Sequence, residues 1–175
     1  MNMTSRLSRT VRNAALALCV GSMLAVPTSA QTSDPDRLRA AIVFNVLRFI
    51  DFPDTSRGQI DFCVASNRSA ASNFQAFSGR RAGSRTVLVR RVQGTAYAGC
   101  DVVYLGSASS SEVATASRSG RLTMGNGRSF IDRGGMVGLV QMGNQVRFEV
   151  NLEAAGESDL RISSRLIRLA ARVKR

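Results

Sequence analysis

Residues 59–65 read Gln-Ile-Asp-Phe-Cys-Val-Ala, and this short apolar stretch decides the fold. Its aromatic and β-branched side chains are typical of a strand buried within a sheet. The elements predicted after it are a loop at 66–69, a helix at 70–77 that Gly79 ends, strands at 86–92 and 101–105, and a helix at 110–119. Because strands that are apolar almost throughout alternate with helices, the sequence predicts an α/β sandwich with helices on both faces of a sheet.

A helix is predicted before this stretch, at residues 34–49. Asp34 suits the N-cap position and Pro35 the first helical position. The helix should end near Asp51, because Pro53 forces the residue before it toward an extended conformation. The residues that repeat at spacings of three and four, on one face, are Leu38, Ala41, Ile42, Asn45, Val46 and Phe49.

The pattern changes after Gly120. A short strand at 122–124 precedes a glycine-rich stretch at 133–138, and two apolar segments, 139–142 and 146–150, then flank Gly143-Asn144-Gln145. A Gly-Asn pair tolerates the backbone of a tight turn, so these segments predict a hairpin. The fold predicted is therefore a single-domain three-layer sandwich whose sheet is mixed but mostly parallel.

The C-terminal residues 162–174 predict an amphipathic helix with two stripes. The apolar stripe consists of Ile162, Leu166, Leu169 and Val173, and the basic stripe of Arg161, Arg165, Arg168 and Arg172. Both stripes advance by four, three and four residues, which keeps each on its own helix face. The arginines are either a solvated face or a basic strip that contacts an acidic partner or a membrane surface.

Residues 1–30 have the pattern of a cleavable export signal. Three arginines, at positions 6, 9 and 12, precede the apolar stretch 14–26, and small residues at Thr28 and Ala30 suit cleavage before Gln31. At 13 residues this stretch is shorter than a membrane span needs. We therefore expect a periplasmic domain at 31–175.

Cleavage would remove Cys19 and leave Cys63 and Cys100 in an oxidising compartment. We interpret these two cysteines as one disulfide; two free buried thiols are the alternative. A closed loop of 37 residues would stabilise the fold by about 4 kcal/mol on the chain-entropy model.

The protein is strongly basic, with a formal net charge of +12. Loss of the three arginines of the export signal would lower the net charge to +9. Export removes nucleic acid as a partner, so the candidates are anionic lipid, polyanionic envelope polymers or an acidic protein face. The alternative is an arginine-rich composition without a binding role, since only Lys174 among the 24 basic residues is lysine.

Catalytic signatures are missing from the sequence. It has no histidine, which excludes histidine-dependent triads and histidine-based zinc sites. Its carboxylates are scattered, and it contains no nucleophile elbow or Walker-type loop. Gly125-Asn126-Gly127 could cradle a phosphate, although a turn is the commoner role of such a stretch. We expect a binding protein without metal or cofactor, not an enzyme.

Four segments of the chain resemble the YfiR family. Residues 41–53 (Ala-Ile-Val-Phe-Asn-Val-Leu-Arg-Phe-Ile-Asp-Phe-Pro) resemble its opening helix, except that Phe52 replaces a tryptophan. The C-terminal segments 133–139 (Arg-Gly-Gly-Met-Val-Gly-Leu), 144–155 and 160–170 follow the order of the family's signature. The resemblance covers nearly all of the chain after the export signal.

This resemblance implies a periplasmic α/β domain, often dimeric, that binds the periplasmic part of an inner-membrane diguanylate cyclase and restrains cyclic-di-GMP synthesis. Cys63 and Cys100 match positions at which many relatives carry a cysteine pair. A second, closely spaced pair that some relatives carry has no counterpart here, which puts redox regulation through that pair in doubt.

The leading hypothesis is a regulatory binding protein, and the alternative is a solute-binding module with a pocket near the strand ends, Asn45 and Arg133. A third hypothesis, an envelope assembly factor, rests on the basic helix alone. The candidate partner or ligand residues are Asn45, Arg133, Gly134, Gly135, Arg161, Arg165, Arg168 and Arg172. Gly134 and Gly135 also suit a positive φ or a close backbone approach. Arg147 and Glu149 suit either a surface ion pair or a partner patch.

Overall fold

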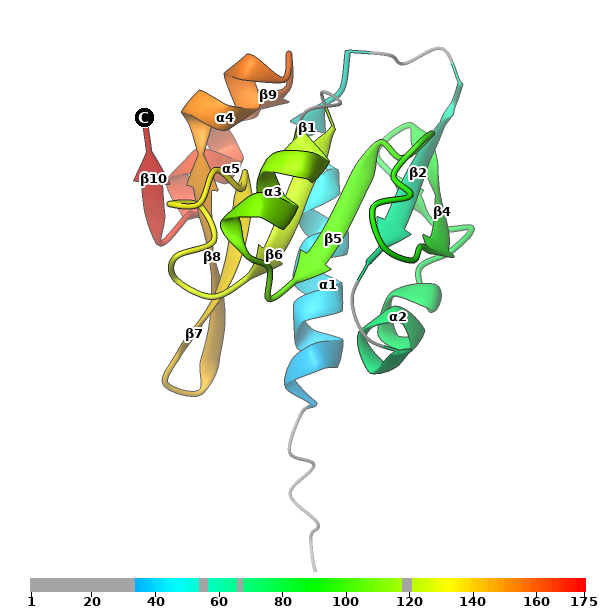
Figure 1. The fold of residues 1–175 in the computed structure, drawn as a ribbon, viewed down its shortest axis with the longest axis horizontal. Coiled ribbons are helices and arrows are strands. Elements are labelled where there is room, and N and C mark those ends of the chain that lie inside the picture. The colour runs from blue at the N-terminus through cyan, green and yellow to red at the C-terminus, as the bar shows by residue number, and fades with distance from the viewer. Residues whose placement is uncertain (1–33, 54–56, 66–67, 118–120) are drawn as a thin grey trace, which may run out of the picture. The chain divides into compact units, whose positions relative to one another are not determined.

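An eight-stranded sheet runs through the molecule (Figure 1). In spatial order its strands are β10 (Arg172–Lys174), β8 (Gln145–Asn151), β7 (Val137–Met142), β6 (Leu122–Asn126), β5 (Val102–Gly106), β2 (Gln59–Val64), β4 (Arg85–Arg91) and β3 (Arg81–Ala82). Only the pairs β7–β8 and β3–β4 are antiparallel among these described strands. The mixed, mostly parallel sheet and the hairpin predicted from the sequence are confirmed.

The remaining elements are α1 (Pro35–Leu47), β1 (Ile50–Asp51), α2 (Arg68–Gln75), α3 (Ser110–Ser117), α4 (Leu152–Glu157), β9 (Arg161–Ile162) and α5 (Ser164–Leu169). The structure is a computed structural model that describes residues 34–53, 57–65, 68–117 and 121–175. The expected export signal at 1–30 lies outside the described residues.

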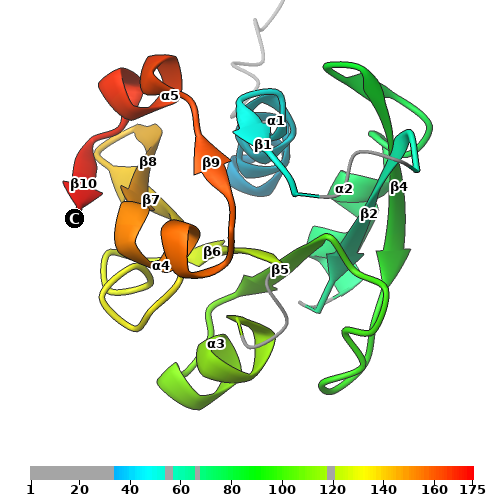
Figure 2. The ribbon, with the colours of Figure 1, turned by 90° about the horizontal axis from the view of Figure 1, so that it is seen from above.

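The inner face of the sheet curls around α1, as the view from above shows (Figure 2). Phe44 of α1 stacks on Phe77, which follows α2, with ring centroids 4.8 Å apart. Phe74 of α2 contacts both Phe62 and Tyr104, at 5.0 and 4.5 Å between centroids. Apolar side chains of α4 and α5 join the same core. This packing explains why α1 needs apolar residues on most of its circumference.

A second, smaller core lies on the outer face, under α3 and the loop 127–136. Phe130 and Ile131 enter it from the loop and Val113 from α3, all fully buried. Cys63 and Cys100 belong to the same cluster. With helices on both faces of the sheet, the predicted three-layer sandwich is confirmed.

The first helix begins as predicted and ends two residues early. The Asp34 side chain accepts a hydrogen bond from the Asp36 amide, and Pro35 occupies the first turn. Beyond Leu47 the chain straightens into β1, which pairs antiparallel with β9. Phe49 therefore follows the helix, and its carbonyl accepts a hydrogen bond from the Ser163 amide.

The C-terminal helix predicted at 162–174 is much shorter, which corrects its bounds. Its N-cap is Ser163, whose hydroxyl accepts a hydrogen bond from the Leu166 amide, and α5 ends at Leu169. The flanking residues pair as strands, β9 with β1 and β10 with β8. Because strand pairing satisfies backbone groups that a helix would otherwise pair internally, it overrides the helical spacing of the side chains.

The helix α4 is absent from the prediction. Asn151 caps it, since its side-chain oxygen accepts a hydrogen bond from the Ala154 amide while its nitrogen donates to the Ile131 carbonyl. An asparagine before Leu-Glu-Ala-Ala was the available signal.

Candidate binding site

A groove of about 240 Å³ opens between α1, β8 and α5. Its lining residues are Ile42, Asn45, Val46, Phe49, Val146, Arg147, Phe148, Leu166 and Leu169. The apolar spacing of α1 supplies one wall, and alternation along β8 supplies Val146 and Phe148. The groove has a predominantly apolar floor, and its polar lining residues are Asn45 and Arg147.

Leu169 is the most exposed large apolar side chain at this groove, at 56%. The sequence predicted that Leu169 shares one apolar stripe with Leu166, which is buried. The difference follows from the shortened helix: Leu169 is its last residue, and the chain turns toward β10 directly after it. The exposed Leu169 side chain thus extends the apolar surface of the groove.

Basic side chains stand at the rim of the groove. Arg147 lines it directly, and Arg165 lies over the Phe49 ring at 5.9 Å from the centroid. Arg168 is exposed on the same short helix α5. Asn45 is exposed on the α1 wall. Of the predicted site residues, Asn45 lines the groove and Arg165 lies over its lining residue Phe49, whereas for Arg168 only its exposure on α5 is established.

Arg161 lies elsewhere, in β9, where it pairs with Asp51 of β1. It lines a second hollow, of about 480 Å³, with Asp51, Phe52, Pro53, Gly156, Asp159 and Leu160. The arginine stripe predicted for one helix is therefore divided among β9, α5 and β10.

Arg172, the last residue of that stripe, holds β10 in place. Its guanidinium donates two hydrogen bonds to the Asp132 carboxylate, one to Glu149 and one to the Arg128 carbonyl, at 2.8–2.9 Å. The hydrogen bonds from Arg172 lower the pKa of Asp132, and both carboxylates raise the pKa of Arg172. Glu149 is thus paired with Arg172 and Arg147 lines the groove, so the ion pair between Arg147 and Glu149, one of the two alternatives for these residues, is wrong.

The glycine-rich loop is shaped by packing around Phe130. Gly134 has a positive φ of 94°, and a Cβ on Gly135 would lie 2.1 Å from the Phe130 ring. Both requirements expected of these glycines are confirmed. Arg133 donates a hydrogen bond to the Ser129 hydroxyl within this loop. The loop covers the outer face of the sheet and Asn45 lies on the inner side, so Asn45 and Arg133 are on opposite faces of the sheet.

The Gly125-Asn126-Gly127 stretch ends β6 and turns. Gly125 packs against Phe130, the Asn126 oxygen accepts a hydrogen bond from the Tyr104 hydroxyl at 2.8 Å, and Gly127 has a φ of 96°. These contacts support the interpretation of this stretch as a turn, because the Asn126 side chain and the backbone of both glycines make contacts or take conformations that the fold itself requires.

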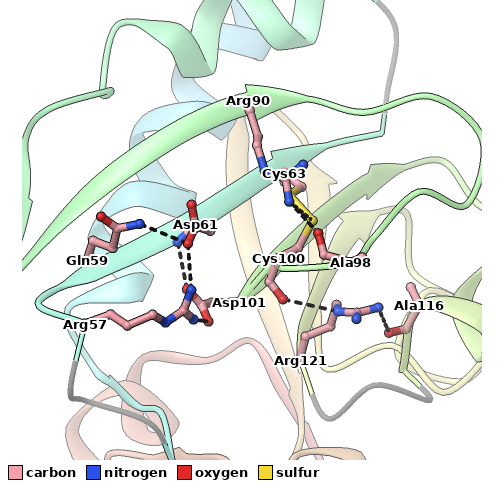
Figure 3. Close-up of a disulfide and its surroundings, with 10 residues drawn as sticks. All are labelled: Arg57, Gln59, Asp61, Cys63, Arg90, Ala98, Cys100, Asp101, Ala116 and Arg121. Atoms are coloured by element: carbon pink, nitrogen blue, oxygen red, sulfur yellow. Dashed lines mark hydrogen bonds and ion pairs between the residues drawn. A yellow bond between two sulfur atoms is a disulfide. The ribbon is translucent and has the colours of Figure 1, made fainter.

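Cys63 and Cys100 form a disulfide that joins β2 to the entrance of β5 (Figure 3). Their Cα atoms are 5.8 Å apart, and both cysteines are buried. Arg90 of β4 donates hydrogen bonds to the Cys100 sulfur and to the Ala98 carbonyl. Arg57 bridges Asp61 and Asp101 beside the same strands. The predicted pairing is confirmed, and its place beside two core strands is that of a structural bond.

The comparison with family models decides the classification. The model of the YfiR/HmsC-like family matches residues 36–171. The chain belongs to this family. The YfiR/HmsC-like proteins are periplasmic regulators of diguanylate cyclase signalling, which supports the regulatory class inferred from the resemblance. No curated protein matches the chain.

Solved structures resemble this YfiR/HmsC-like chain in fold. A conserved domain protein from Vibrio cholerae O1 biovar El Tor strain N16961 superposes with a TM-score of 0.56 at 12% identity, covering 80% of this chain and 60% of that one. An ABC domain in complex with L-Trp from Streptococcus pneumoniae superposes with a TM-score of 0.55 at 11% identity, covering 79% and 60%. The chain thus spans about 60% of the length of these structures.

Neither membrane spans nor metal clusters are found in the described parts of this family member. None of the helices within residues 34–53, 57–65, 68–117 and 121–175 has the length and apolarity of a membrane span. The same residues contain no cluster of three or more potential metal ligands.

Proposed function

We propose that this chain is exported to the periplasm, docks on the periplasmic part of an inner-membrane diguanylate cyclase through the groove of α1, β8 and α5, and restrains the cyclase. The observation that carries the docking site is the exposed Leu169 beside an apolar groove with arginines at its rim. Family membership supports the regulatory role and the compartment.

The partner surface that fits this groove is apolar at its centre and acidic around it. Apolar contact at Leu169 and Phe148 would bury area, whereas Arg147, Arg165 and Arg168 would steer an acidic face toward the groove. We therefore expect that changes to the apolar residues mainly speed dissociation, and that changes to the arginines act mainly on the association rate and its salt dependence.

The test measures cyclic-di-GMP in the bacterium that carries the gene. Deleting the gene should raise the cellular level, and the wild-type chain should restore it. Variants Leu169→Glu and Arg168→Glu should fail to restore it although they remain folded, because both side chains are exposed. A deletion strain whose cyclic-di-GMP level is unchanged would contradict the proposed role.

The matched control is Arg128→Glu, which changes the charge by the same amount at an exposed residue of the loop that covers the outer face of the sheet. It should restore the level as wild type does. A photo-crosslinking residue at position 169 should capture the cyclase, and one at Ser111 of α3, on the opposite face, should not. Equal capture from both positions would remove the groove from the proposal.

Binding of a small solute is the second candidate, and the hollow lined by Asp51, Asp159 and Arg161 favours it. Its volume of about 480 Å³ falls within the usual range for ligand sites, roughly 300–1,000 Å³, whereas the groove does not. Two carboxylates and one guanidinium would select a polar ligand with a cationic group. Calorimetry with amino acids and polyamines on the wild type and on Asp159→Asn tests it; binding unaffected by the change would reject this hollow.

A further inference from the structure

The β3–β4 edge of the sheet is only partly covered. The strand β3 pairs with only the first two residues of β4, Arg85 and Thr86. Farther along, Val87 exchanges hydrogen bonds with the Gly79 amide and the Arg80 carbonyl, and the Ser78 hydroxyl accepts one from the Val89 amide. The remaining stretch of β4, from the Val89 carbonyl to Arg91, is an open edge.

The direction of the backbone groups follows from alternation along the strand. Thr86 and Val92 donate toward the side of β2, to the carbonyls of Gly58 and Val64. The backbone N–H and C=O groups of the odd-numbered residues of β4 therefore point away from β2, toward the open edge. For the Val89 carbonyl and both backbone groups of Arg91, no hydrogen-bond partner is found in the part of the chain that the structure describes. Three backbone groups are thus available to an added strand.

This end of the sheet is also strongly basic. The sequence between Phe62 and Cys100 contains six arginines and no aspartate or glutamate. The nearest carboxylates along the strands, Asp61 and Asp101, are paired with Arg57. The basic charge here is consequently not balanced within the segment.

Four of these arginines are exposed, namely Arg80, Arg81, Arg90 and Arg91. Within the described ranges, none of the four makes an ion pair. Arg81 and Arg90 instead donate to the carbonyls of Ser84 and Ala98, which leaves their charge in place. Because side chains alternate along β4, Arg90 and Arg91 stand on opposite faces of the sheet.

We propose that the open edge of β4 at Val89–Arg91 accepts an extended acidic segment of a partner protein as an additional strand. Backbone hydrogen bonds would hold the segment, and acidic side chains on either of its faces would meet an arginine. The charge complementarity selects an acidic occupant and disfavours a second copy of this edge, which would bring the same arginines together. This surface is independent of the groove and goes beyond the proposed function.

The probe is a short peptide in which pairs of adjacent glutamates alternate with single valines, so that both faces of the extended peptide are acidic; it is titrated against the intact mature chain. Binding should weaken as salt rises. Arg91→Glu should weaken it at least about tenfold, since an attraction is replaced by a repulsion beside the bound segment. Hydrogen exchange at the Arg91 amide should slow when the peptide binds, because that amide then has a partner.

Two controls separate backbone pairing from charge alone. The same peptide with methyl groups on alternate backbone nitrogens keeps its charge but loses donors, so it should bind much more weakly; equal binding would overturn the added strand. Arg48→Glu, at an exposed residue after α1, should leave binding unchanged. No peptide binding, or an Arg91→Glu variant that binds like wild type, would overturn the proposal and leave the arginines as charges that keep this edge unpaired.

Discussion

Arg172 determines the position of the C-terminal strand through four hydrogen bonds. They reach Asp132 and the Arg128 carbonyl in the loop after β6, and Glu149 in β8. Arg172 and Asp132 are both exposed, so water screens their attraction, whereas the Glu149 side chain is only 9% exposed. The pair with Glu149 is therefore the one whose loss would leave a buried charge without its partner.

Tyr104 is the residue whose ionisation the fold opposes most clearly. It is buried in β5, and its hydroxyl donates to Asn126 at 2.8 Å. Burial raises the pKa of Tyr104 to about 12, above the ordinary value of 10.0. Since the folded state binds this proton more tightly than the unfolded state, its contribution to stability is present below pH 10 and is lost as the pH rises toward 12.

We predict that the wild type loses stability in this alkaline range and that Tyr104→Phe loses less of it. At neutral pH the same variant should be destabilised by about 1 kcal/mol, because the hydrogen bond to Asn126 is removed. Denaturant unfolding at a series of pH values measures both effects. The near-ultraviolet absorbance of tyrosinate gives the direct check: titration of Tyr104 at an ordinary pKa in the folded protein would contradict the prediction.

At the scale of elements, the short helix α5 carries one buried and one exposed leucine within a single turn. Leu166 packs into the main core and Leu169, three residues later, is exposed at the groove. A helix through 174 would have placed both on the same buried stripe. The Ser163 cap and the two flanking strand pairings stop the helix before that can happen.

Truncating these two leucines should give different results. Leu166→Ala should destabilise the domain by about 2–5 kcal/mol, since it leaves a cavity in the core. Leu169→Ala should change the unfolding free energy by less than about 0.5 kcal/mol, because its side chain is already largely in water. Urea unfolding of both variants measures the contrast. Equal losses would mean that Leu169 is buried and that the groove is closed in solution.

At the scale of the whole molecule, the disulfide ties β2 to the entrance of β5 across 37 residues of chain. The enclosed segment contains α2, β3 and β4, the end of the sheet that carries the open edge. Constraining this segment in the unfolded state is the main stabilising effect of the bond, because a long closed loop loses more chain entropy.

The double variant Cys63→Ser with Cys100→Ser should lower the unfolding free energy by about 4 kcal/mol on the chain-entropy model. A reductant should lower the stability of the wild type toward that of the variant and leave the variant itself unchanged. Thermal unfolding with and without reductant measures this. Labelling of two free thiols in the denatured, unreduced periplasmic protein would reject the bond.

The central strands, α1 and the disulfide could be predicted from local sequence. Short apolar runs bounded by polar turns specify β2, β4 and β5, and Asp34 with Pro35 marks the start of α1. The expected cleavage of the export signal would leave only two cysteines to pair. The strands and α1 depend on residues close in sequence, and two cysteines can form only one disulfide. None of these features therefore required knowledge of the tertiary arrangement.

The tertiary structure alone decided the C-terminal segment and the candidate groove. Residues 161–174 carry a helical spacing of apolar and basic side chains, yet β9 and β10 pair with strands more than ten residues distant. Arg172 finds carboxylates at positions 132 and 149, and Leu169 is exposed beside Phe148 and Asn45. Periodicity reports only which side chains share a face of an assumed helix. Backbone hydrogen bonds and ion pairs between distant segments determine whether that helix forms and which residues remain at the surface.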